Sequence, residues 1–269
     1  MSATPKGMVC RVDGSRLAYY LRAADEEFWD RRWTSSEVEE RMVAARQGHL
    51  GTYAKWFDRY LPKSGKLVEA GCGLGQYVVA LRQRGFDVEG VEWARNTVGM
   101  LNDLYPEVPI RAGDVSNLDA DDGYYSGYIS LGVVEHRQQG PEPFLDEAYR
   151  VLQPGGVAIF TVPYINVIRK TKRLLGLYHS SIEGREFYQY AFSRREFVAL
   201  LGQAGFRVEQ VSGCDSYKGI FDELAMLSWV KRMRLGRYDV GALVQRGLEK
   251  FPWIESQCGH MCIVVCTRP

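Results

Sequence analysis

The stretch LVEAGCGLGQYVVAL, residues 67–81, joins an apolar run to a stretch with helical spacing through glycines at positions 71, 73 and 75. The run predicts a β-strand, and the stretch after it predicts a helix. Glycine adopts a positive φ without steric cost and lacks the Cβ that would keep a ligand from the backbone. Ligands of open parallel sheets bind at the carboxyl ends of the strands, beside the N–H groups of helix N-termini. The loop therefore predicts a binding site, with a tight turn that binds nothing as the alternative.

Strands and helices alternate on the carboxyl side of this loop, which indicates an α/β protein. Helices of about a dozen residues separate most of the strands, so we expect a parallel sheet with right-handed crossovers. Strands are predicted at residues 66–71, 86–93, 108–114, 124–134, 157–164, 206–213 and 259–269.

The remaining segments interrupt or precede this alternation. We divide the chain into an N-terminal helical extension (1–64), a cofactor-binding core (65–163), an insertion that forms a lid over the acceptor (164–192) and the rest of the core (193–269). Within the last part, residues 215–256 are predicted to be a helical insertion. In the first part, TSSE at 34–37 is a capping box that begins a helix.

Composition and charge restrict the class of protein. The formal net charge of +1 gives no field that favours nucleic acid. No apolar run approaches the ~18 residues of a membrane-spanning helix, and the N-terminus lacks the apolar segment of a secretory signal. The scattered cysteines fit a reducing compartment, so we expect a cytoplasmic protein. Cys258, Cys262 and Cys266 are predicted to face the core from the last strand, with a zinc site that includes His260 as the alternative.

The glycine spacing separates two kinds of adenosine ligand. A dinucleotide fingerprint, G-x-G-x-x-G, requires a third glycine at position 76, where the chain has Gln76. Glu92, at the end of the next predicted strand, can accept hydrogen bonds from ribose hydroxyls. Both an NAD site and a site for a smaller adenosine ligand remain open on these residues alone.

The ordered motifs EAGCGLG, Glu92, Gly113-Asp114, LGVVEH and LQPGG resemble those of class I S-adenosylmethionine-dependent methyltransferases. The resemblance covers residues 66–212 and the last strand, and is greatest to quinone-biosynthesis and other small-molecule methyltransferases. It implies S-adenosyl-L-methionine as cofactor. It also implies a Rossmann-like, doubly wound sheet of seven mostly parallel strands with an antiparallel last strand.

The same resemblance implies the residues that bind the cofactor. Those near its methionine half are Glu69, Ala70, Gly71, Cys72 and Gly73. Those near its adenosine half are Glu92 on the ribose, Trp93, Asp114 and Val115 at the adenine, and Leu131 at the end of the fourth strand. Asp114 as a turn residue and Trp93 as a core residue are the alternatives. The arginines of FWDRRW, residues 28–33, are candidates for binding the cofactor carboxylate.

His136 is the predicted catalytic residue. An oxygen or nitrogen acceptor needs a base, and an imidazole with an ordinary pKa near ~6.5 suits that task. A histidine that only hydrogen-bonds a loop is the alternative. Some quinone methyltransferases place an acidic metal ligand three positions before the Glu-His pair; Gly132 stands there, so we predict no metal.

The acceptor is predicted to be a small molecule or a glycan- or lipid-linked molecule, walled by Tyr164, Tyr188 and Tyr190. These side chains could instead pack the lid. The basic run RKTKR, residues 169–173, could meet a phosphorylated substrate or a membrane surface peripherally, or be a solvated helix face. An NAD-dependent oxidoreductase and a non-catalytic cofactor-binding protein are the alternative functions.

Overall fold

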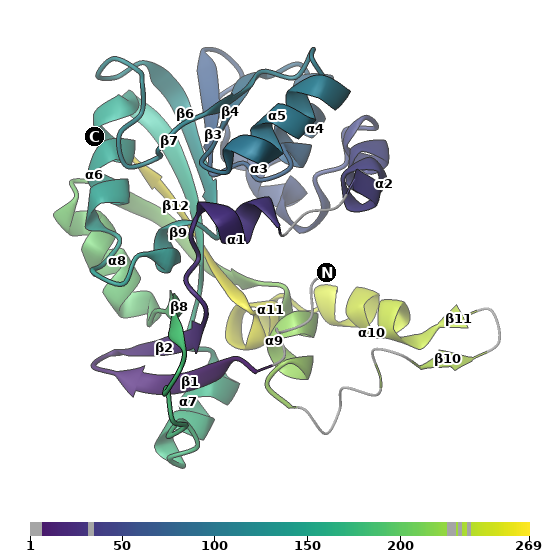
Figure 1. The fold of residues 1–269 in the computed structure, drawn as a ribbon, viewed down its shortest axis with the longest axis vertical. Helices are drawn as coiled ribbons and strands as arrows, with labels where there is room; N and C mark the ends of the chain where they lie inside the picture. The colour runs from purple at the N-terminus through teal and green to yellow at the C-terminus, as the bar shows by residue number, and fades with distance from the viewer. Residues whose placement is uncertain (1–6, 32–34, 225–229, 231–232, 236–237) are drawn as a thin grey trace. The chain divides into compact units, whose positions relative to one another are not determined.

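The computed structural model of the chain describes residues 7–31, 35–224, 230, 233–235 and 238–269 (Figure 1). It has two compact units. The core unit comprises Ala23–Thr161, Val198–Gln210 and Val264–Pro269. The accessory unit comprises Met1–Arg22, Val162–Phe197 and Val211–Ile263.

The predicted parallel sheet is confirmed, with seven strands in the order β5-β4-β3-β6-β7-β12-β9. The pairs β3–β4, β3–β6, β4–β5 and β6–β7 are parallel. The last strand, β12, is antiparallel to β7. The amide of Gly155 donates to the carbonyl of Arg268, and the amide of Arg268 donates to the carbonyl of Gly156. The strands are β3 (Lys66–Ala70), β4 (Asp87–Glu92), β5 (Ile110–Ala112), β6 (Tyr125–Leu131), β7 (Leu152–Pro163), β9 (Arg207–Cys214) and β12 (Met261–Thr267).

The order of these strands reverses at β3. The chain passes from β3 outward to β4 and β5, and then returns to place β6 on the other side of β3. Such a reversal leaves a crevice beyond the carboxyl ends of the two central strands, because their connections run in opposite directions. The glycine loop follows β3 directly and therefore lies at this crevice.

Apolar strands and helices bury the sheet of the core unit. In β6 every residue before Leu131 is buried, as expected for a strand covered on both faces. The rings of Tyr128, Phe160 and Phe206 contact one another in the core. The helices of this region are α4 (Gln76–Gln83), α5 (Arg95–Leu104), α6 (Glu142–Val151) and α8 (Arg194–Gln203), with the short η2 (Val134–His136) after β6.

The predicted helical extension over residues 1–64 is wrong at its start. Helices form at α1 (Glu26–Asp30), α2 (Ser35–Ala45), η1 (Gly51–Tyr53) and α3 (Ala54–Tyr60), but β1 (Val9–Asp13) and β2 (Arg16–Leu21) form an antiparallel hairpin. Gly14, with φ 56°, allows the two-residue turn between them. The capping box at 34–37 includes Thr34, which lies outside the described residues.

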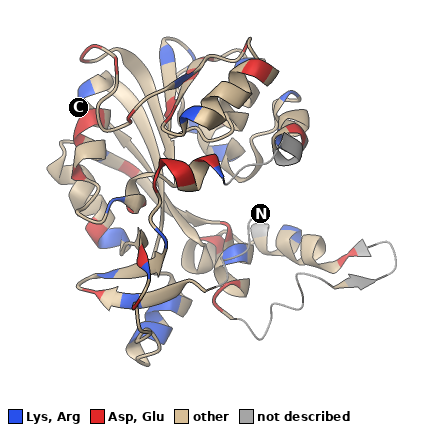
Figure 2. Cartoon of the chain, in the orientation of Figure 1, with Lys and Arg blue, Asp and Glu red and all other residues tan. Residues whose placement is uncertain are grey.

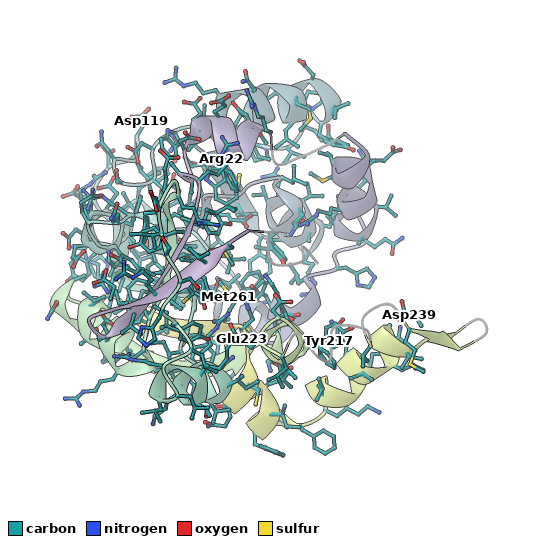
Figure 3. The ribbon with its side chains drawn as sticks, turned by 60° about the horizontal axis from the view of Figure 1, so that its bottom comes forward. Arg22, Asp119, Tyr217, Glu223, Asp239 and Met261 are labelled. Atoms are coloured by element: carbon teal, nitrogen blue, oxygen red, sulfur yellow. The ribbon has the colours of Figure 1, made fainter. Side chains whose placement is uncertain are left out.

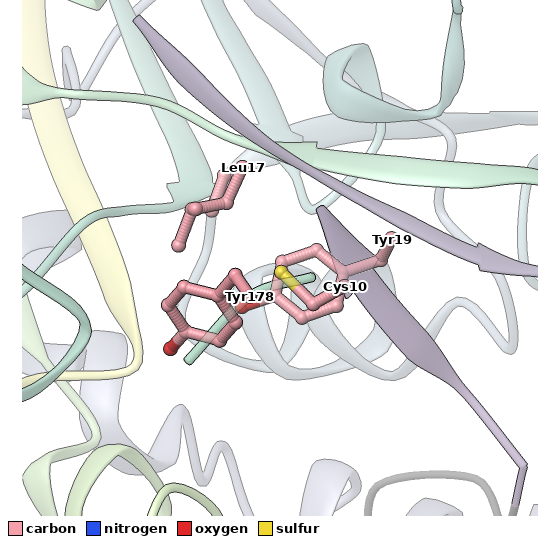
Figure 4. Packing of buried hydrophobic residues seen from close by; sticks show 5 residues of the cluster. Cys10, Leu17, Tyr19 and Tyr178 are labelled. Carbon is pink, nitrogen blue, oxygen red and sulfur yellow. The ribbon is translucent and has the colours of Figure 1, made fainter. Parts of the chain in front are cut away.

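The accessory unit is built on this hairpin. Strand β8 (Glu186–Ala191) pairs with β2 and completes a three-stranded sheet, so the predicted lid insertion contributes a strand as well as a helix, α7 (Val167–Leu174). Cys10, Leu17, Tyr19 and Tyr178 pack into one buried cluster beneath the sheet (Figure 4). Aromatic and branched residues in β1, β2 and β8 thus give this unit its own core.

The tract predicted to be helical, 215–256, is mostly helix where the structure describes it. Its elements are α9 (Ser216–Phe221), β10 (Arg234–Leu235), β11 (Tyr238–Asp239), α10 (Val240–Glu249) and α11 (Pro252–Cys258). Cys258 therefore ends a helix and does not share the strand face of Cys262 and Cys266, which are buried on β12. No helix in the described part of the chain combines the length and apolar character that crossing a bilayer requires.

The conformation of the glycine loop predicts that substitution of Gly75 destabilises the protein. Gly75 has φ 68°, and a Cβ there would collide with the Ile110 side chain. We expect Gly75→Ala to lower the free energy of unfolding by about 1–3 kcal/mol, measured by urea denaturation. Gly99→Ala is the control, because Gly99 lies within α5 with no heavy atom near its missing Cβ, and it should be neutral or stabilising. Equal stability of the two variants would contradict the prediction.

Candidate active site

The glycine loop folds back against the neighbouring strand. The amides of Gly71 and Cys72 both donate to the carbonyl of Val91 in β4, at 2.8 and 3.1 Å. Gly71, Gly73 and Gly75 have φ values of 77°, 54° and 68°. Gly75 is the N-cap of α4, so the loop delivers the chain to the start of that helix. The predicted strand–loop–helix is therefore confirmed.

Part of the glycine pattern has a cause within the protein. A Cβ on Gly71 would lie 2.5 Å from Cγ2 of Val133, and one on Gly75 would overlap Ile110. These two glycines let the Val133 side chain, after β6, and the Ile110 side chain, in β5, approach the loop. A tight turn and a ligand site thus require the same residues, and the glycines alone do not separate the two interpretations.

The side chain that closes the loop is Glu92, at the end of β4. Its Oε2 accepts from the amide of Gly73 at 2.7 Å, and its Oε1 accepts from the amide of Ala94 at 3.0 Å. A carboxylate offers about four acceptor positions, so two remain after these bonds. The residue is buried, with 7% of its surface exposed. This arrangement suits a pair of vicinal hydroxyls.

Glu69 lies deeper, at the fourth position of β3. It is buried, and its Oε2 has no hydrogen-bond partner among the described residues. Burial raises the pKa of this carboxyl group well above 4.5, and the charge of Glu92 raises it further, against the lowering effect of the Val78 amide. A buried acceptor oxygen left open beside a positive-φ loop fits a ligand that carries N–H donors and positive charge.

The predicted adenine contacts lie on connections after β4 and β5. Trp93 is 48% exposed, so it is available to a planar ligand and is not a core residue. Asp114 is exposed, and its Oδ1 accepts from both the amide and the hydroxyl of Ser116, at 2.8 and 2.7 Å. It therefore stabilises a turn. Val115 beside it is buried.

Helix α1 reaches this site from the N-terminal part of the core unit. Asp30 accepts from the amide of Thr97 at 2.9 Å and from Asn96 at 2.8 Å, so it caps the N-terminus of α5. Trp29 contacts the ring of His136 edge to face, with centroids 5.2 Å apart. Helix α5 follows β4 and η2 follows β6, while β3 lies between those strands. Helix α1 therefore crosses the carboxyl end of β3.

His136 and Leu131 lie where they were predicted, at the end of β6. Both are half-buried, and His136 ends the single turn η2 after Gly132, whose φ is 72°. Glu135 beside it is buried. The structure thus brings His136 and the glycine loop to adjacent connections of one crevice. The contacts of Trp29 and Asp30 were not predicted, because their partners lie far along the chain.

The predicted acceptor residues lie together in the accessory unit. The hydroxyl of Tyr164 donates to the carbonyl of Ser256 at 2.5 Å, and that of Tyr190 donates to Asp13 at 3.1 Å. Both rings are buried, and Tyr188 packs against the cluster beneath the three-stranded sheet. The packing alternative accounts for these contacts. Their role toward an acceptor stays a prediction.

The arginines predicted to hold a cofactor carboxylate are described in part. Arg31 is exposed and pairs with Glu27 on its own helix. Arg32 lies outside the described residues. Arg41 of α2 donates to Gln76 at 3.0 Å, beside the start of α4. The residue that departs from the dinucleotide fingerprint is thus held by a neighbouring helix.

Known proteins resemble this chain. A probable S-adenosylmethionine-dependent methyltransferase of Mycolicibacterium smegmatis is 28% identical over 198 residues, which are 74% of this chain and 70% of that protein. Two solved structures share the fold. One is a methyltransferase of Thermotoga maritima, a possible histamine N-methyltransferase, with TM-score 0.55, 17% identity and coverage of 91% and 100% of the two chains. The other is a geranyl diphosphate C-methyltransferase of Streptomyces coelicolor, with TM-score 0.53, 14% identity and coverage of 93% and 90%.

The family follows from a match to a family model. Residues 44–211 match the methyltransferase domain family, which is more than half of the chain and includes the glycine loop, Glu92 and His136. This result decides against the NAD-dependent oxidoreductase that the glycine spacing had left open. The open acceptor positions of Glu69 and Glu92 fit the amino and ribose groups of the cofactor of this family. The chain belongs to the methyltransferase domain family and is an S-adenosylmethionine-dependent methyltransferase.

Proposed function

We propose that this enzyme methylates an oxygen or nitrogen atom of a small molecule or of a glycan- or lipid-linked acceptor, with His136 as the general base. The observation that carries the proposal is the position of His136, half-buried on the connection after β6, at the same crevice as the glycine loop. The bound cofactor supplies an activated methyl group. The protein has to align the acceptor with it, exclude water and remove one proton.

In this proposal the residues of the core unit divide the cofactor between them. Glu69 and the backbone from Ala70 to Gly73 lie at its methionine half, and Glu92 holds the ribose hydroxyls. Trp93 stacks on the adenine, while Asp114 and Val115 lie at its edge and Leu131 borders it. The unused acceptor positions of Glu69 and Glu92 and the exposure of Trp93 support these roles.

His136 would take the proton that the acceptor loses as its oxygen or nitrogen bonds to the methyl carbon and the carbon–sulfur bond breaks. Its contact with Trp29 orients the ring, since an edge-to-face pair restricts rotation of both partners. We propose that no metal takes part, as Gly132 offers no ligand. The two similar proteins of known structure are named for different acceptors, an amine and a diphosphate. The shared fold therefore does not determine which acceptor this enzyme methylates.

A direct experiment tests the class of acceptor. The purified enzyme is incubated with S-adenosylmethionine and panels of phenols, amines and lipid-linked saccharides, and formation of S-adenosylhomocysteine is measured. Turnover with an oxygen or nitrogen acceptor is expected. Turnover with carbon acceptors alone would overturn the proposal. The cytoplasmic location stays a prediction.

Substitution of the proposed base should affect transfer and not binding. We expect His136→Ala to lower kcat by roughly 100-fold or more, the usual contribution of a general base, and to change the Kd of S-adenosylhomocysteine less than about twofold. His49→Ala is the control, because His49 is exposed on the turn after α2. A kcat equal to that of the unmodified enzyme would eliminate the role of His136.

Glu92→Ala should weaken cofactor binding and also lower the stability of the fold. The change removes the acceptor for Gly73 and Ala94, so we expect the free energy of unfolding to fall by about 1–3 kcal/mol. Loss of the ribose contacts should raise the Kd of S-adenosylhomocysteine at least about tenfold, measured by calorimetry on protein shown to be folded. Glu107→Ala, at an exposed glutamate, should change neither quantity. An unaltered Kd for Glu92→Ala would contradict the ribose role.

The raised pKa of Glu69 predicts proton release on binding. Burial keeps this carboxyl group protonated above its ordinary pKa of 4.5, and positive charge brought beside it favours ionisation. Binding of S-adenosylmethionine should therefore lower the pKa of Glu69 and release protons at pH values between its pKa in the bound and in the free enzyme. Calorimetric titrations in phosphate and in Tris should then give different enthalpies, and Glu69→Gln should abolish the difference. Equal enthalpies for the unmodified enzyme would show the prediction to be wrong.

A further inference from the structure

Helix α7 of the accessory unit is amphipathic, but two of its charged side chains face the protein and two of its apolar side chains are exposed. The side chains of Arg169 and Lys172 face the protein and are 3% and 27% exposed. Val167 and Leu174 lie two turns apart on the opposite side of the helix, and they are 46% and 79% exposed. An ordinary surface helix buries its apolar stripe and exposes its charges. The outward face of α7 therefore presents two exposed apolar side chains next to the exposed Lys170 and Thr171.

The charged side chains on the inward side of α7 form ion pairs with Glu223. Glu223 accepts from Arg169 Nε and from Lys172 Nζ, both at 2.7 Å, and from the hydroxyl of Tyr178 at 3.0 Å. Burial alone would raise the pKa of Glu223, but Arg169 and Lys172 hold it below 4.5, so the carboxylate is ionised. Glu223 is labelled in Figure 3. This network fixes which side of α7 faces outward.

The end of α7 extends the apolar surface. The helix stops at Gly176, with φ 68°, whose amide donates to Arg173, and the amide of Leu177 donates to Lys172. Leu175 and Leu177 flank this turn and are 68% and 58% exposed. We call Leu174, Leu175 and Leu177 the leucine tip. The hydrogen-bonded turn holds all three side chains in place although they face solvent.

Basic residues flank the leucine tip. Residues 167–187 contain five lysines and arginines; Arg169 and Lys172 pair with Glu223, which leaves Lys170, Arg173 and Arg185 against two glutamates. Lys170 is exposed on the same stripe as Val167 and Leu174, and Arg173 donates to the carbonyls of Gly14 and Ser15 in the β1–β2 turn. Figure 2 marks the basic residues of α7 in blue. The leucine tip and the basic residues near it form one surface.

We propose that the leucine tip inserts into the interface of an anionic lipid bilayer, with Lys170 and the basic residues around it at the headgroup level. A short apolar projection with a basic collar is the pattern of reversible interfacial binding, in which apolar burial and attraction to anionic lipid act together. A protein partner fits less well, since the exposed leucines offer only a few hundred Å² of apolar surface against the ~800 Å² per partner of a stable interface.

Vesicle flotation of the full-length enzyme tests this proposal. Vesicles of phosphatidylcholine, with and without phosphatidylglycerol, are compared at low and at physiological salt. We expect binding to the anionic vesicles, weakened by salt because the basic collar is screened. Replacement of the leucine tip by L174Q, L175Q and L177Q together should reduce the bound fraction at least about tenfold. Lys170→Glu alone should reduce it less.

A matched control separates the tip from general apolar exposure. The double variant L104Q and L243Q removes exposed leucines from α5 and α10, and should bind vesicles like the unmodified enzyme. Equal binding by the tip variant, or none by the unmodified enzyme, overturns the proposal. So does a dimer that the tip variant converts to a monomer, because a second copy would then occupy the surface. Affinity for S-adenosylhomocysteine should be unchanged in the tip variant, so this test is independent of the proposed base and acceptor.

Discussion

The carboxylate of Glu92 holds the catalytic crevice together. Its two hydrogen bonds join the middle of the glycine loop to the second residue after β4, so the connections after β3 and β4 both depend on one side chain. Together the two bonds stabilise the loop by about 1–3 kcal/mol. They use about two of the four acceptor positions of the carboxylate, so the group that shapes the loop can also accept from a ligand.

The sequence predicted the sheet and the location of the crevice, because both depend on local patterns. Apolar runs, helical periodicity and glycines placed β3, α4, β4 and the connection to His136 correctly. The hairpin β1–β2 was missed, although Asp13-Gly14 between alternating residues is a recognised turn signal. Asp30 and Trp29 could not be predicted, since a helix cap or ring contact between residues distant in sequence leaves no local trace.

The basic run at 169–173 shows how charge patterns mislead. In sequence it favours a solvated face or a site for anions. In the structure Arg169 and Lys172 neutralise one buried carboxylate, and the exposed side of the helix carries Val167 and Leu174 beside Lys170. Burying two cations is tolerable only because Glu223 and backbone carbonyls satisfy them. Which side of such a helix faces outward is set by its partner, Glu223, which lies 50 residues later.

Helix α1 links the two halves of the crevice. Consecutive residues of this short helix contact the start of α5, next to the residues proposed for the ribose and adenine, and His136, the proposed base. A five-residue helix has little stability of its own, so its position depends on these contacts. Any shift of α5 on cofactor binding would therefore move Trp29 as well as Asp30. The ring that contacts His136 is in this way tied to the part of the site where the cofactor is proposed to bind.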